Sequence, residues 1–537
     1  MTDTPRILIT PSPLSDISTT INKPNVHPSM SLLKALPECR LVVKSKGDKN
    51  NANVVEFPLD RHKQLLIAGK VYHDYKFKPR KSIFDRVTDP NYFAKSEFRG
   101  FYVLFWLSMA AWVLQLYARS YWQRDTLLGL PLARQVFRQF FVLFSSDFLM
   151  ICLSFFSYGL QVCIEKNMIR WANLGYTIQT LWQGFYMVLA VYWVKHRDFP
   201  IVQCVFFTLH CAVLIMKQFS YSHHMGYISE IRILHNEYEK LLKFVRECLN
   251  STEKDEKYTF ELTFPNKPAE TISTLQAEEI VALTAKYLSR QMRSEVGNVV
   301  YPDNINFFNY VDYLLVPSLV YSMEFPRVAH FRWHYMAFKA GSTFGLLALT
   351  LALVDWYFVP SAVAVKDLDF IGKLRIAPLL MNKIMFPAII LYLIMFYLIF
   401  DCILNAFAEI TKFADRGFYG AWWNTVTWDE FSREWNKPVH VFLMRHVYHS
   451  SISGFKLKKS HAVLLTFLIS ALVHEFVMLL ATGKFRCYIL TFQLLQIPLY
   501  DLQQMFAFKK RDILGNVFFW IGMFTGPSFL CILYIVF

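Results

Sequence analysis

The chain has 537 residues, of which 54% are hydrophobic and only 18% are charged. Soluble domains are about 45–50% apolar and about 25% charged, so this composition excludes a chain that hides its apolar surface in one water-soluble core. The net charge of +15 comes from basic residues placed between apolar runs, which favours anionic lipid surfaces over nucleic acid as the partner. We therefore expect a membrane protein without a nucleic-acid partner.

The first element in chain order, residues 1–95, is expected to be a polar and largely disordered cytosolic segment. Residues 1–28 are rich in Ser, Thr, Pro and Asp and show no apolar stretch of the kind a signal peptide requires. The run Lys44–Asn53 is the part least expected to fold, whereas Leu32–Leu36 is compatible with a short docking helix. No chemistry is visible in this segment.

Residues 96–537 form the predicted transmembrane domain. Its apolar runs are long enough to cross a hydrocarbon core of about 30 Å, which takes about 20 helical residues each. The fold class is therefore an all-α polytopic membrane protein with about nine transmembrane helices. The predicted spans are approximately 101–118, 139–163, 172–194, 199–221, 336–358, 378–402, 462–482, 485–506 and 514–536.

Basic residues predict the orientation of these spans. The cluster Lys76–Arg86 precedes the first span and indicates a cytosolic N-terminus. Nine crossings also place Lys456–Lys459 and Lys509–Arg511 in the cytosol, as the excess of basic residues in cytosolic loops predicts. They leave the four arginines of Arg119–Arg138 in the lumen, against this positive-inside rule.

Two polar insertions, at about 222–330 and 405–460, interrupt the spans and are expected to be cytosolic. Residues 222–300 show the periodicity of an amphipathic helix with mixed charge. Residues 301–330 are aromatic and contain prolines, which predicts a re-entrant or interfacial segment. The insertion 405–460 is dense in Trp, Tyr, His, Asn and Arg, so chemistry is expected there.

The nine cysteines are scattered and form no CxxC pair, so they indicate neither a disulfide framework nor a zinc site, although one luminal disulfide stays open. His446 and His449 form an HxxH pair, but no cluster of carboxylates or cysteines accompanies it. We therefore expect no metal site.

The strongest chemical feature is the run LISALVHEFVMLLA, which places His474 and Glu475 inside an apolar span. Ionisable groups at membrane depth cost about 2.5–3.5 kcal/mol on insertion scales and are functional candidates by default. Histidine takes up and returns a proton near neutral pH, which suits a general base. The alternative is a histidine that a neighbouring helix satisfies and that serves only packing. An HExxH zinc motif is excluded because Met478 stands at its second histidine.

Asn436 and His440 lie four residues apart in the run REWNKPVHVFLMRHVYH. In a helix interrupted near Pro438 they still project to roughly one face. There an amide and an imidazole can hold a carbonyl oxygen or orient a cofactor, and an ordinary polar interfacial helix is an equally good interpretation.

A second basic group accompanies this run. Arg433, Arg445 and Lys456–Lys459 are interpreted as an anion site at the membrane surface, for nucleotide phosphates or for lipid headgroups.

The segment FYGAWWN at 418–424 is followed by TWDEFSREWNKPVHVFLMRHVYHSS and SALVHEF. Together these segments resemble the sterol O-acyltransferases of the membrane-bound O-acyltransferase superfamily, and their residues are most similar to those of the fungal sterol-ester synthases. The likeness covers the chain from about residue 100 onward. It implies the architecture of that superfamily and acyl-CoA-dependent esterification of a membrane sterol such as ergosterol. It also implies an endoplasmic-reticulum membrane location and a homodimer or homotetramer. Long-chain fatty acyl-CoA is then a co-substrate, and no tightly bound cofactor is expected.

The resemblance also implies roles for single residues. His474 corresponds to the catalytic histidine and Asn436 to its partner near the thioester carbonyl. The positions that match the acyl-CoA path of the family are Arg433, Asn436, His440, Tyr448, Lys459 and Ser470. The aromatic motif retains Phe418, Tyr419, Trp422, Trp423 and Asn424.

The motif departs from the family pattern F-Y-x-D-W-W-N at one position, where Ala421 replaces the acid. We expect the family's acid to pin the aromatic loop by pairing or hydrogen bonding, which a methyl group cannot do. Either Asp415 or Asp429 compensates, or activity is weak, or the loop is held differently.

The position of His474 suggests how the two substrates meet. It lies about 14 residues into its span, or about 20 Å at 1.5 Å per residue. The charged nucleotide of CoA is expected to stay at the cytosolic mouth near Lys459 and Arg433, while the pantetheine arm carries the thioester inward and the sterol arrives from the bilayer.

Three other functions stay open at this point. They are a diacylglycerol O-acyltransferase, a transporter that uses His474 as a proton relay, and a catalytically weak sterol-binding scaffold, which Ala421 favours.

Overall fold

The computed structural model describes residues 40–45, 55–57, 75–87, 99–125, 128–251, 258–264, 267–295, 297–505 and 512–536. The chain divides into two compact units, which are described separately below. One unit consists of Met1–Lys70 and Tyr227–Arg293, and the other of Val71–Gly226 and Ser294–Phe537. This division differs from the predicted boundary near residue 95, because part of the N-terminal segment pairs with part of the first insertion.

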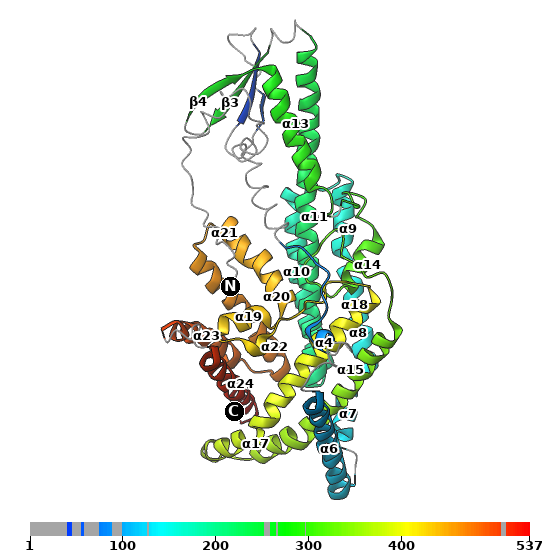
Figure 1. The fold of residues 1–537 in the computed structure, drawn as a ribbon, viewed down its shortest axis with the longest axis vertical. Helices are drawn as coiled ribbons and strands as arrows, with labels where there is room; N and C mark the ends of the chain where they lie inside the picture. Colours follow the sequence, from blue (N-terminus) through cyan, green and yellow to red (C-terminus); the bar gives the residue numbers. More distant parts are fainter. Residues whose placement is uncertain are drawn as a thin grey trace. The chain divides into compact units, whose positions relative to one another are not determined.

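Most of the larger unit is helical (Figure 1). Its α-helices are α4 (Ile83–Val87), α6 (Arg99–Arg124), α7 (Leu130–Val136), α8 (Phe140–Ser154), α9 (Phe156–Glu165), α10 (Tyr176–Arg197), the first part of α11 (Ile201–Leu249), α14 (Phe307–Leu315), α15 (Trp333–Leu353), α16 (Val359–Val365), α17 (Phe370–Phe396), α18 (Leu404–Ile410), α19 (Trp428–Glu434), α20 (Lys437–Leu443), α21 (Ser450–Ser453), α22 (Lys459–Thr482), α23 (Tyr488–Met505) and α24 (Asp512–Val536). Shorter or wider helical turns are η3 (Trp171–Gly175), η4 (Val354–Phe358), η5 (Tyr397–Ile403), η6 (Trp422–Asn424) and η7 (Met444–His449).

Within the described residues, six helical stretches are long and apolar enough to cross a membrane: Phe140–Glu165, Ile201–Leu249, Trp333–Val365, Phe370–Ile410, Lys459–Thr482 and Asp512–Val536. The polytopic membrane character is thereby confirmed. The three remaining predicted spans fall on α6, α10 and α23, which are helices of 26, 22 and 18 residues but are not among these six stretches. A count of nine is therefore not established.

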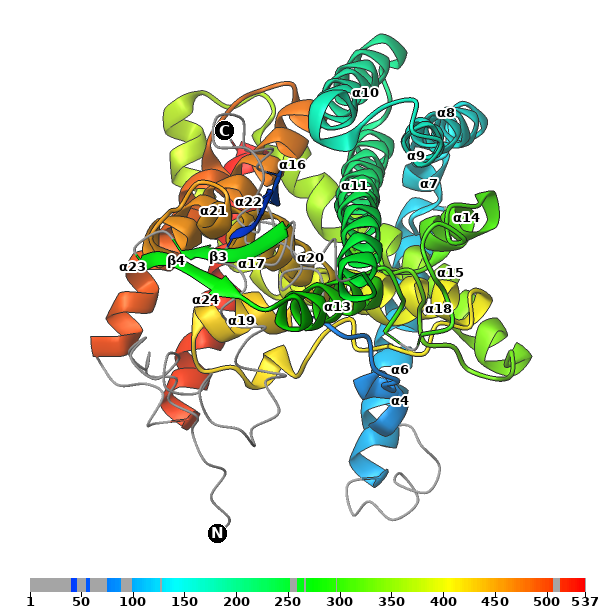
Figure 2. The same ribbon diagram turned by 90° about the horizontal axis from the view of Figure 1, so that it is seen from above.

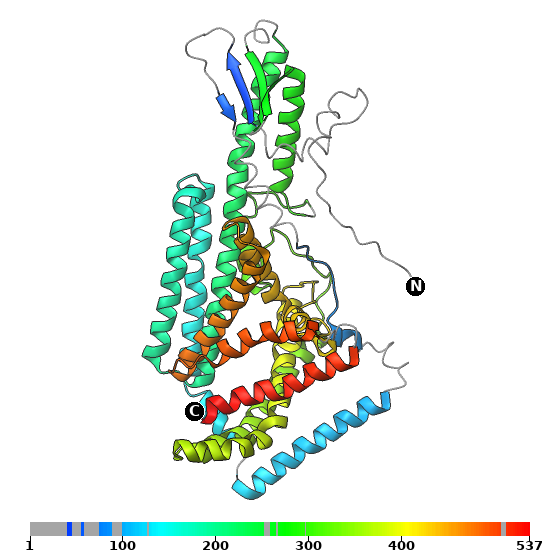
Figure 3. The same cartoon turned by 90° about the vertical axis from the view of Figure 1, so that its left-hand side faces the viewer.

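The cores of the larger unit form between neighbouring helices. Met150 of α8, Tyr186 of α10 and Leu214 of α11 are buried in one apolar cluster, and Figure 3 shows these helices side by side. Ile384 of α17 and Ile532 of α24 are buried in a second cluster. Many other apolar side chains of these helices are exposed, among them Phe141, Phe144 and Leu149 of α8, as expected where lipid is the solvent.

The segment predicted to be re-entrant or interfacial contains only one short helix. α14 has nine residues, and its first turn is capped by Asn306, whose side chain accepts a hydrogen bond from the backbone N–H of Asn309 at 2.8 Å. No α-helix forms between its end and the start of α15. A helix of this length is far shorter than the roughly 20 residues that a crossing needs.

The smaller unit contains a four-stranded sheet, so the prediction of an all-α fold was wrong in this part of the chain. The strands β1 (Arg40–Ser45), β2 (Val55–Phe57), β3 (Tyr258–Phe264) and β4 (Lys267–Ile272) are antiparallel in the order β2-β1-β3-β4. Lys44, at the start of the run expected not to fold, pairs with Glu261 at 2.6 Å. The proposed docking helix at 32–36 lies outside the described residues.

The sheet is accompanied by two helices. α11 continues past Gly226 as one uninterrupted helix, which agrees with the amphipathic helix predicted after residue 222. α13 (Thr274–Gln291) begins with a capping box between Ser273 and Gln276. Arg246 of α11 pairs with Glu278 of α13 at 2.9 Å, and Figure 2 shows these two helices close together beside the strands.

Candidate active site

His474 lies on α22, fifteen residues after the helix begins at Lys459, or about 22 Å along its axis. Its side chain is exposed, and its Nδ1 atom lies 2.7 Å from the backbone carbonyl oxygen of Ser470. Because a carbonyl oxygen only accepts, Nδ1 must carry the proton in this contact. In the neutral ring Nε2 is then the free basic nitrogen. The local helix geometry therefore sets the tautomer that a general base needs.

The neighbouring Glu475 points to the other side of α22 and has a different role. Its carboxylate is 1% exposed and accepts backbone hydrogen bonds from Cys487 at 2.7 Å, Ile489 at 3.1 Å and Leu490 at 3.2 Å. These are the otherwise unpaired N–H groups at the start of α23. A negative charge at a helix N-terminus is also favoured by the helix dipole. Glu475 therefore ties α23 to the helix that carries His474.

We expect Glu475→Ala to lower the free energy of unfolding by at least about 2 kcal/mol, because three N–H donors lose their acceptor. Glu475→Gln retains one acceptor oxygen and should have a smaller effect. Thermal unfolding of the detergent-purified variants measures this difference. If Glu475→Ala unfolds like the wild type yet loses turnover, the carboxylate acts in the chemistry and not as a cap.

Asn436 is the N-cap residue of α20, so the predicted helix interrupted near Pro438 is replaced by a helix that begins there. Its Oδ1 accepts a hydrogen bond from the backbone N–H of Val439 at 3.2 Å. Pro438 sits in the first turn, where its missing N–H costs nothing. The side-chain oxygen is thus engaged in the cap, and the Nδ2 amide is the part of Asn436 suited to donate to a carbonyl oxygen.

An open cavity of about 390 Å³ lies against α19, α20 and η7. Among its lining residues, four are cations and one is a carboxylate, which suits an anionic ligand. The lining residues are Tyr75, Arg80, Arg433, Glu434, Lys437, His440, Val441, Met444, Arg445 and His449.

Of the predicted acyl-CoA path, the cavity brings together Arg433 and His440. The remaining members of that set do not line it. Tyr448 is half-buried in η7, Lys459 is exposed at the first residue of α22, and the carbonyl of Ser470 holds the imidazole of His474. Arg445, assigned to the anion site, lines the cavity, whereas Lys456–Lys459 do not.

Two of the four cations of the cavity, Arg433 and Lys437, are held by exchangeable partners. Arg433 pairs with Asp429 at 2.6 Å with 47% and 36% of the two side chains exposed, and Lys437 pairs with Glu434 at 2.9 Å. Exposed pairs of this kind contribute about 0–1 kcal/mol, so an incoming phosphate can compete for the guanidinium at little cost. Burial, together with the nearby Arg433 guanidinium, lowers the pKa of His440, which keeps its imidazole neutral at physiological pH.

The two histidines of the HxxH pair lie in different surroundings. His446 is buried, with Nε2 2.9 Å from the hydroxyl of Ser220, while His449 lines the cavity. Within the described ranges, no group of three or more His, Cys, Asp or Glu side chains is arranged to hold a metal ion.

The aromatic motif serves as a packing centre. Trp422 is 1% exposed and packs on Phe396, Trp435 and Phe519 at ring-centroid distances of 5.1, 5.0 and 6.5 Å. The carbonyl oxygen of Trp423 accepts from Asn516 Nδ2 at 2.9 Å and from Trp520 Nε1 at 3.1 Å. The motif thereby joins α17, α19 and α24.

The other motif residues have mixed surroundings. Phe418 and Tyr419 are buried, whereas Asn424 is exposed. Gly420 donates its N–H to the carbonyl of Glu434 at 2.8 Å, and a Cβ atom there would lie 1.5 Å from the Glu434 carboxylate. Only glycine fits that position without moving Glu434.

Ala421 is exposed at the N-cap of η6, and the loop is held without an acid there. Asp415 pairs with Arg80 and also accepts the backbone N–H of Gly417 at 3.3 Å, just before the motif, whereas Asp429 pairs with Arg433. The contacts of Tyr419, Trp422 and Trp423 hold the motif as well. The effect of Ala421 on activity stays a prediction.

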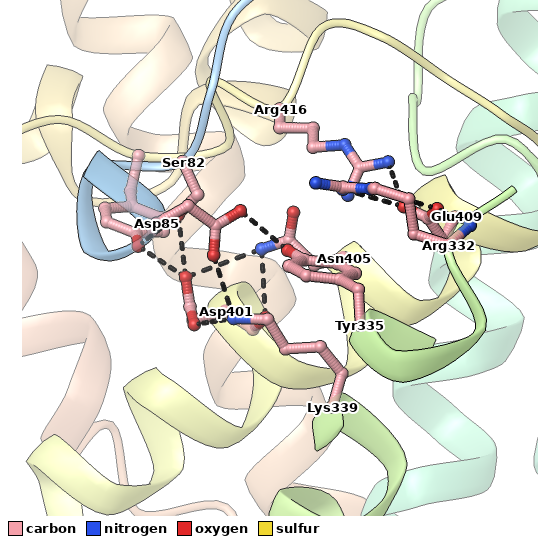
Figure 4. Close-up of polar contacts among 10 residues, drawn as sticks. Ser82, Asp85, Arg332, Tyr335, Lys339, Asp401, Asn405, Glu409 and Arg416 are labelled. Atoms are coloured by element: carbon pink, nitrogen blue, oxygen red, sulfur yellow. Dashed lines mark hydrogen bonds and ion pairs between the residues drawn. The ribbon is translucent and has the colours of Figure 1, made fainter. Parts of the chain in front are cut away.

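A buried ionic cluster lies beside the motif and was missed by the sequence analysis (Figure 4). Lys339 of α15 is 2% exposed and donates to Asp401 of η5 at 2.5 Å, with Asp85 of α4 at 3.3 Å. The hydroxyl groups of Ser82 and Tyr419 donate to Asp401 at 2.7 and 2.8 Å.

A second part of the cluster contains Glu409, which pairs with Arg332 at 2.9 Å and with Arg416 (Figure 4). Three cations face three carboxylates in the whole cluster, so the formal charges cancel. Lys339 and Asp401 both lie in apolar spans. Ionisable groups in such spans are functional candidates by default, so the argument that singled out His474 would also have found these two residues.

The sequence model of the membrane-bound O-acyltransferase family matches residues 188–536. Sterol O-acyltransferase 2 of Candida albicans is 33% identical over 502 residues, which cover 87% of this chain and 79% of the relative. Sterol O-acyltransferase 2 of Saccharomyces cerevisiae is 33% identical over 82% of this chain and 67% of the relative. Diacylglycerol O-acyltransferase 1 of Bos taurus is 32% identical, but over only 44% of this chain and 48% of the relative.

The chain therefore belongs to the membrane-bound O-acyltransferase family and, within it, to the sterol O-acyltransferases. The resemblance seen in the aromatic motif and in SALVHEF is thereby confirmed.

Proposed function

We propose that this protein transfers a fatty acyl group from acyl-CoA to the hydroxyl of a membrane sterol. The likeness to fungal sterol O-acyltransferases over most of the chain carries this assignment. The likeness to a diacylglycerol enzyme covers less than half of the chain, which favours a sterol as the acceptor. The protein is a multi-pass membrane protein, and we place it in the endoplasmic reticulum with a cytosolic N-terminus, as a homodimer or homotetramer.

His474 is the proposed general base. With its Nδ1 proton held by the carbonyl of Ser470, the Nε2 atom takes the proton of the sterol hydroxyl. The sterol oxygen then attacks the thioester carbon, and the Nδ2 amide of Asn436 donates to the developing oxyanion. The carbon–sulfur bond breaks, and the proton on Nε2 passes to the thiolate, so that free CoA and the steryl ester leave. A positioned base of this kind contributes about 10²–10⁴ in rate.

The cationic cavity is the proposed site for the nucleotide end of acyl-CoA. Arg433 and Lys437 offer charge-assisted donors to phosphates, and neutral His440 offers a further hydrogen bond. In this proposal the extended pantetheine arm carries the thioester from the cavity to His474, which lies about 22 Å along α22 from the first residue of that helix. The charged part of the substrate then never enters the apolar region.

The acceptor is tested directly by giving purified protein labelled oleoyl-CoA with ergosterol, with diacylglycerol, or with neither. We expect label in steryl ester and little in triacylglycerol. Ala421→Asp should give a rate within about twofold of the wild type. Ala421 is exposed, and substitutions at exposed positions usually change the free energy of unfolding by no more than about 0.5 kcal/mol. Triacylglycerol as the main product would assign the diacylglycerol reaction instead. Sterol binding without any ester, together with a gain of turnover in Ala421→Asp, would identify a weakened scaffold.

A further inference from the structure

The segment Tyr75–Val87, here called the N-terminal strap, runs along the loop that precedes the aromatic motif. The backbone N–H of Arg80 donates to the carbonyl of Ala414 at 3.0 Å, and the N–H of Arg416 donates to the carbonyl of Arg80 at 3.1 Å. Ser82 donates to Asp401 at 2.7 Å. The strap is thus fixed by backbone and side-chain hydrogen bonds to the rest of the larger unit.

Aromatic packing and a glycine fix the strap further. Phe77 packs edge-on against Phe325 and Phe413, with ring centroids 5.2 and 5.8 Å away. The side chain of Arg80 crosses Gly417, where a Cβ atom would lie 3.1 Å from Arg80 Cδ. The absence of a side chain at Gly417 therefore gives Arg80 its path across the loop.

This arrangement brings two strap residues into the cationic cavity. Tyr75 and Arg80 line it together with Arg433, Lys437 and His440 of α19 and α20. The Arg80 side chain is 34% exposed, and its Nε lies 3.5 Å from the buried carboxylate of Asp415. A guanidinium has five N–H donors, so a pair formed through Nε leaves its terminal nitrogens able to meet a phosphate in the cavity.

We propose that the strap completes the nucleotide end of the acyl-CoA site, with Arg80 binding a phosphate group and Tyr75 packing against the nucleotide. This inference rests on the function proposed above and adds to it a segment for which the sequence indicated no chemistry. Arg80 and Arg433 then approach the phosphates from two segments that are far apart in the chain. A lipid headgroup phosphate offers the same chemistry, so the test must separate the two sources.

The test compares Arg80→Gln with the matched variant Lys78→Gln in neutral-lipid nanodiscs, using full-length protein. Lys78 lies on the same strap, and its side chain is exposed and does not line the cavity. Each protein is given oleoyl-CoA and, separately, S-oleoyl pantetheine, which has the thioester but no nucleotide. We expect Arg80→Gln to raise KM for oleoyl-CoA by about tenfold, the loss of one charge-assisted contact, with kcat unchanged. Turnover of S-oleoyl pantetheine should be unchanged, and Lys78→Gln should match the wild type on both.

Tyr75→Ala provides a second variant that leaves the Arg80–Asp415 pair in place, and it should raise KM for oleoyl-CoA only. Equal losses on both thioesters for Arg80→Gln would show that Arg80 merely anchors the loop and would overturn the proposal. An unchanged KM, or a defect that appears only when anionic lipid is added to the nanodiscs, would also overturn it, the latter in favour of a lipid headgroup. Calorimetric binding of CoA to wild type and Arg80→Gln gives a readout that stands even if no ester forms.

Discussion

Replacing His474 with alanine is expected to lower steryl-ester formation by about 10²–10⁴-fold, because no other group then takes the hydroxyl proton as the oxygen attacks. Since His474 is exposed and, within the described part of the chain, its ring bonds to its own helix backbone through Nδ1, the substitution should leave the fold intact. The measurement is single-turnover ester formation with purified protein, alongside thermal unfolding to verify the fold.

His461→Ala is the matched control for this experiment. His461 lies on the same helix, is exposed, and is near the start of α22. Its replacement should leave turnover within about twofold of the wild type, as for ordinary surface changes. Normal turnover of His474→Ala in folded protein would contradict the assignment and leave His474 as a packing residue.

The largest effect on stability is expected from Lys339→Met. This change leaves Asp401, which is fully buried, without its cationic partner, and removing one member of a buried ion pair costs about 3–5 kcal/mol. The hydrogen bonds that Ser82, Tyr419 and Asn405 donate to the Asp401 carboxylate are then left to stabilise its charge without a cation. The midpoint of thermal unfolding in detergent measures the loss.

A double substitution separates charge from packing. Lys339→Met combined with Asp401→Asn removes both charges while retaining an oxygen acceptor for Ser82, so it should be more stable than Lys339→Met alone. Lys366→Met, at an exposed lysine, should change the free energy of unfolding by less than about 0.5 kcal/mol. A Lys339→Met variant as stable as Lys366→Met would show that the cluster does not support the fold.

Apolar run length located the long helices because each run is by itself long enough to cross a membrane. It could not locate the sheet in the same way, because Val43 pairs with Phe260, far along the chain. The alternation in TFELTF is nevertheless typical of a strand, with Phe260 buried on the inner face. Loops and pairing partners depended on tertiary contacts that local patterns do not contain.

The candidate site was predictable in part for similar reasons. His474 stood out because an ionisable residue is costly in an apolar helix, and Arg433 and His440 lay in one polar run. No sequence pattern places Arg80 beside Arg433, because tertiary contacts such as the hydrogen bonds of Arg80 with Ala414 and Arg416 bring the strap there. Whether Ala421 weakens turnover, one of the three alternatives open from the sequence, stays a prediction for the Ala421→Asp comparison.

The central claim is a division of labour, in which the cationic cavity binds the nucleotide and His474 performs the proton transfer. It is tested most directly by calorimetric binding of a non-reactive thioether analogue of oleoyl-CoA to wild type, His474→Ala and Arg433→Gln. We expect His474→Ala to bind within about twofold of the wild type and Arg433→Gln to bind about tenfold more weakly, as for the loss of one charge-assisted contact. Loss of analogue binding in His474→Ala, with Arg433→Gln binding normally, would contradict this account.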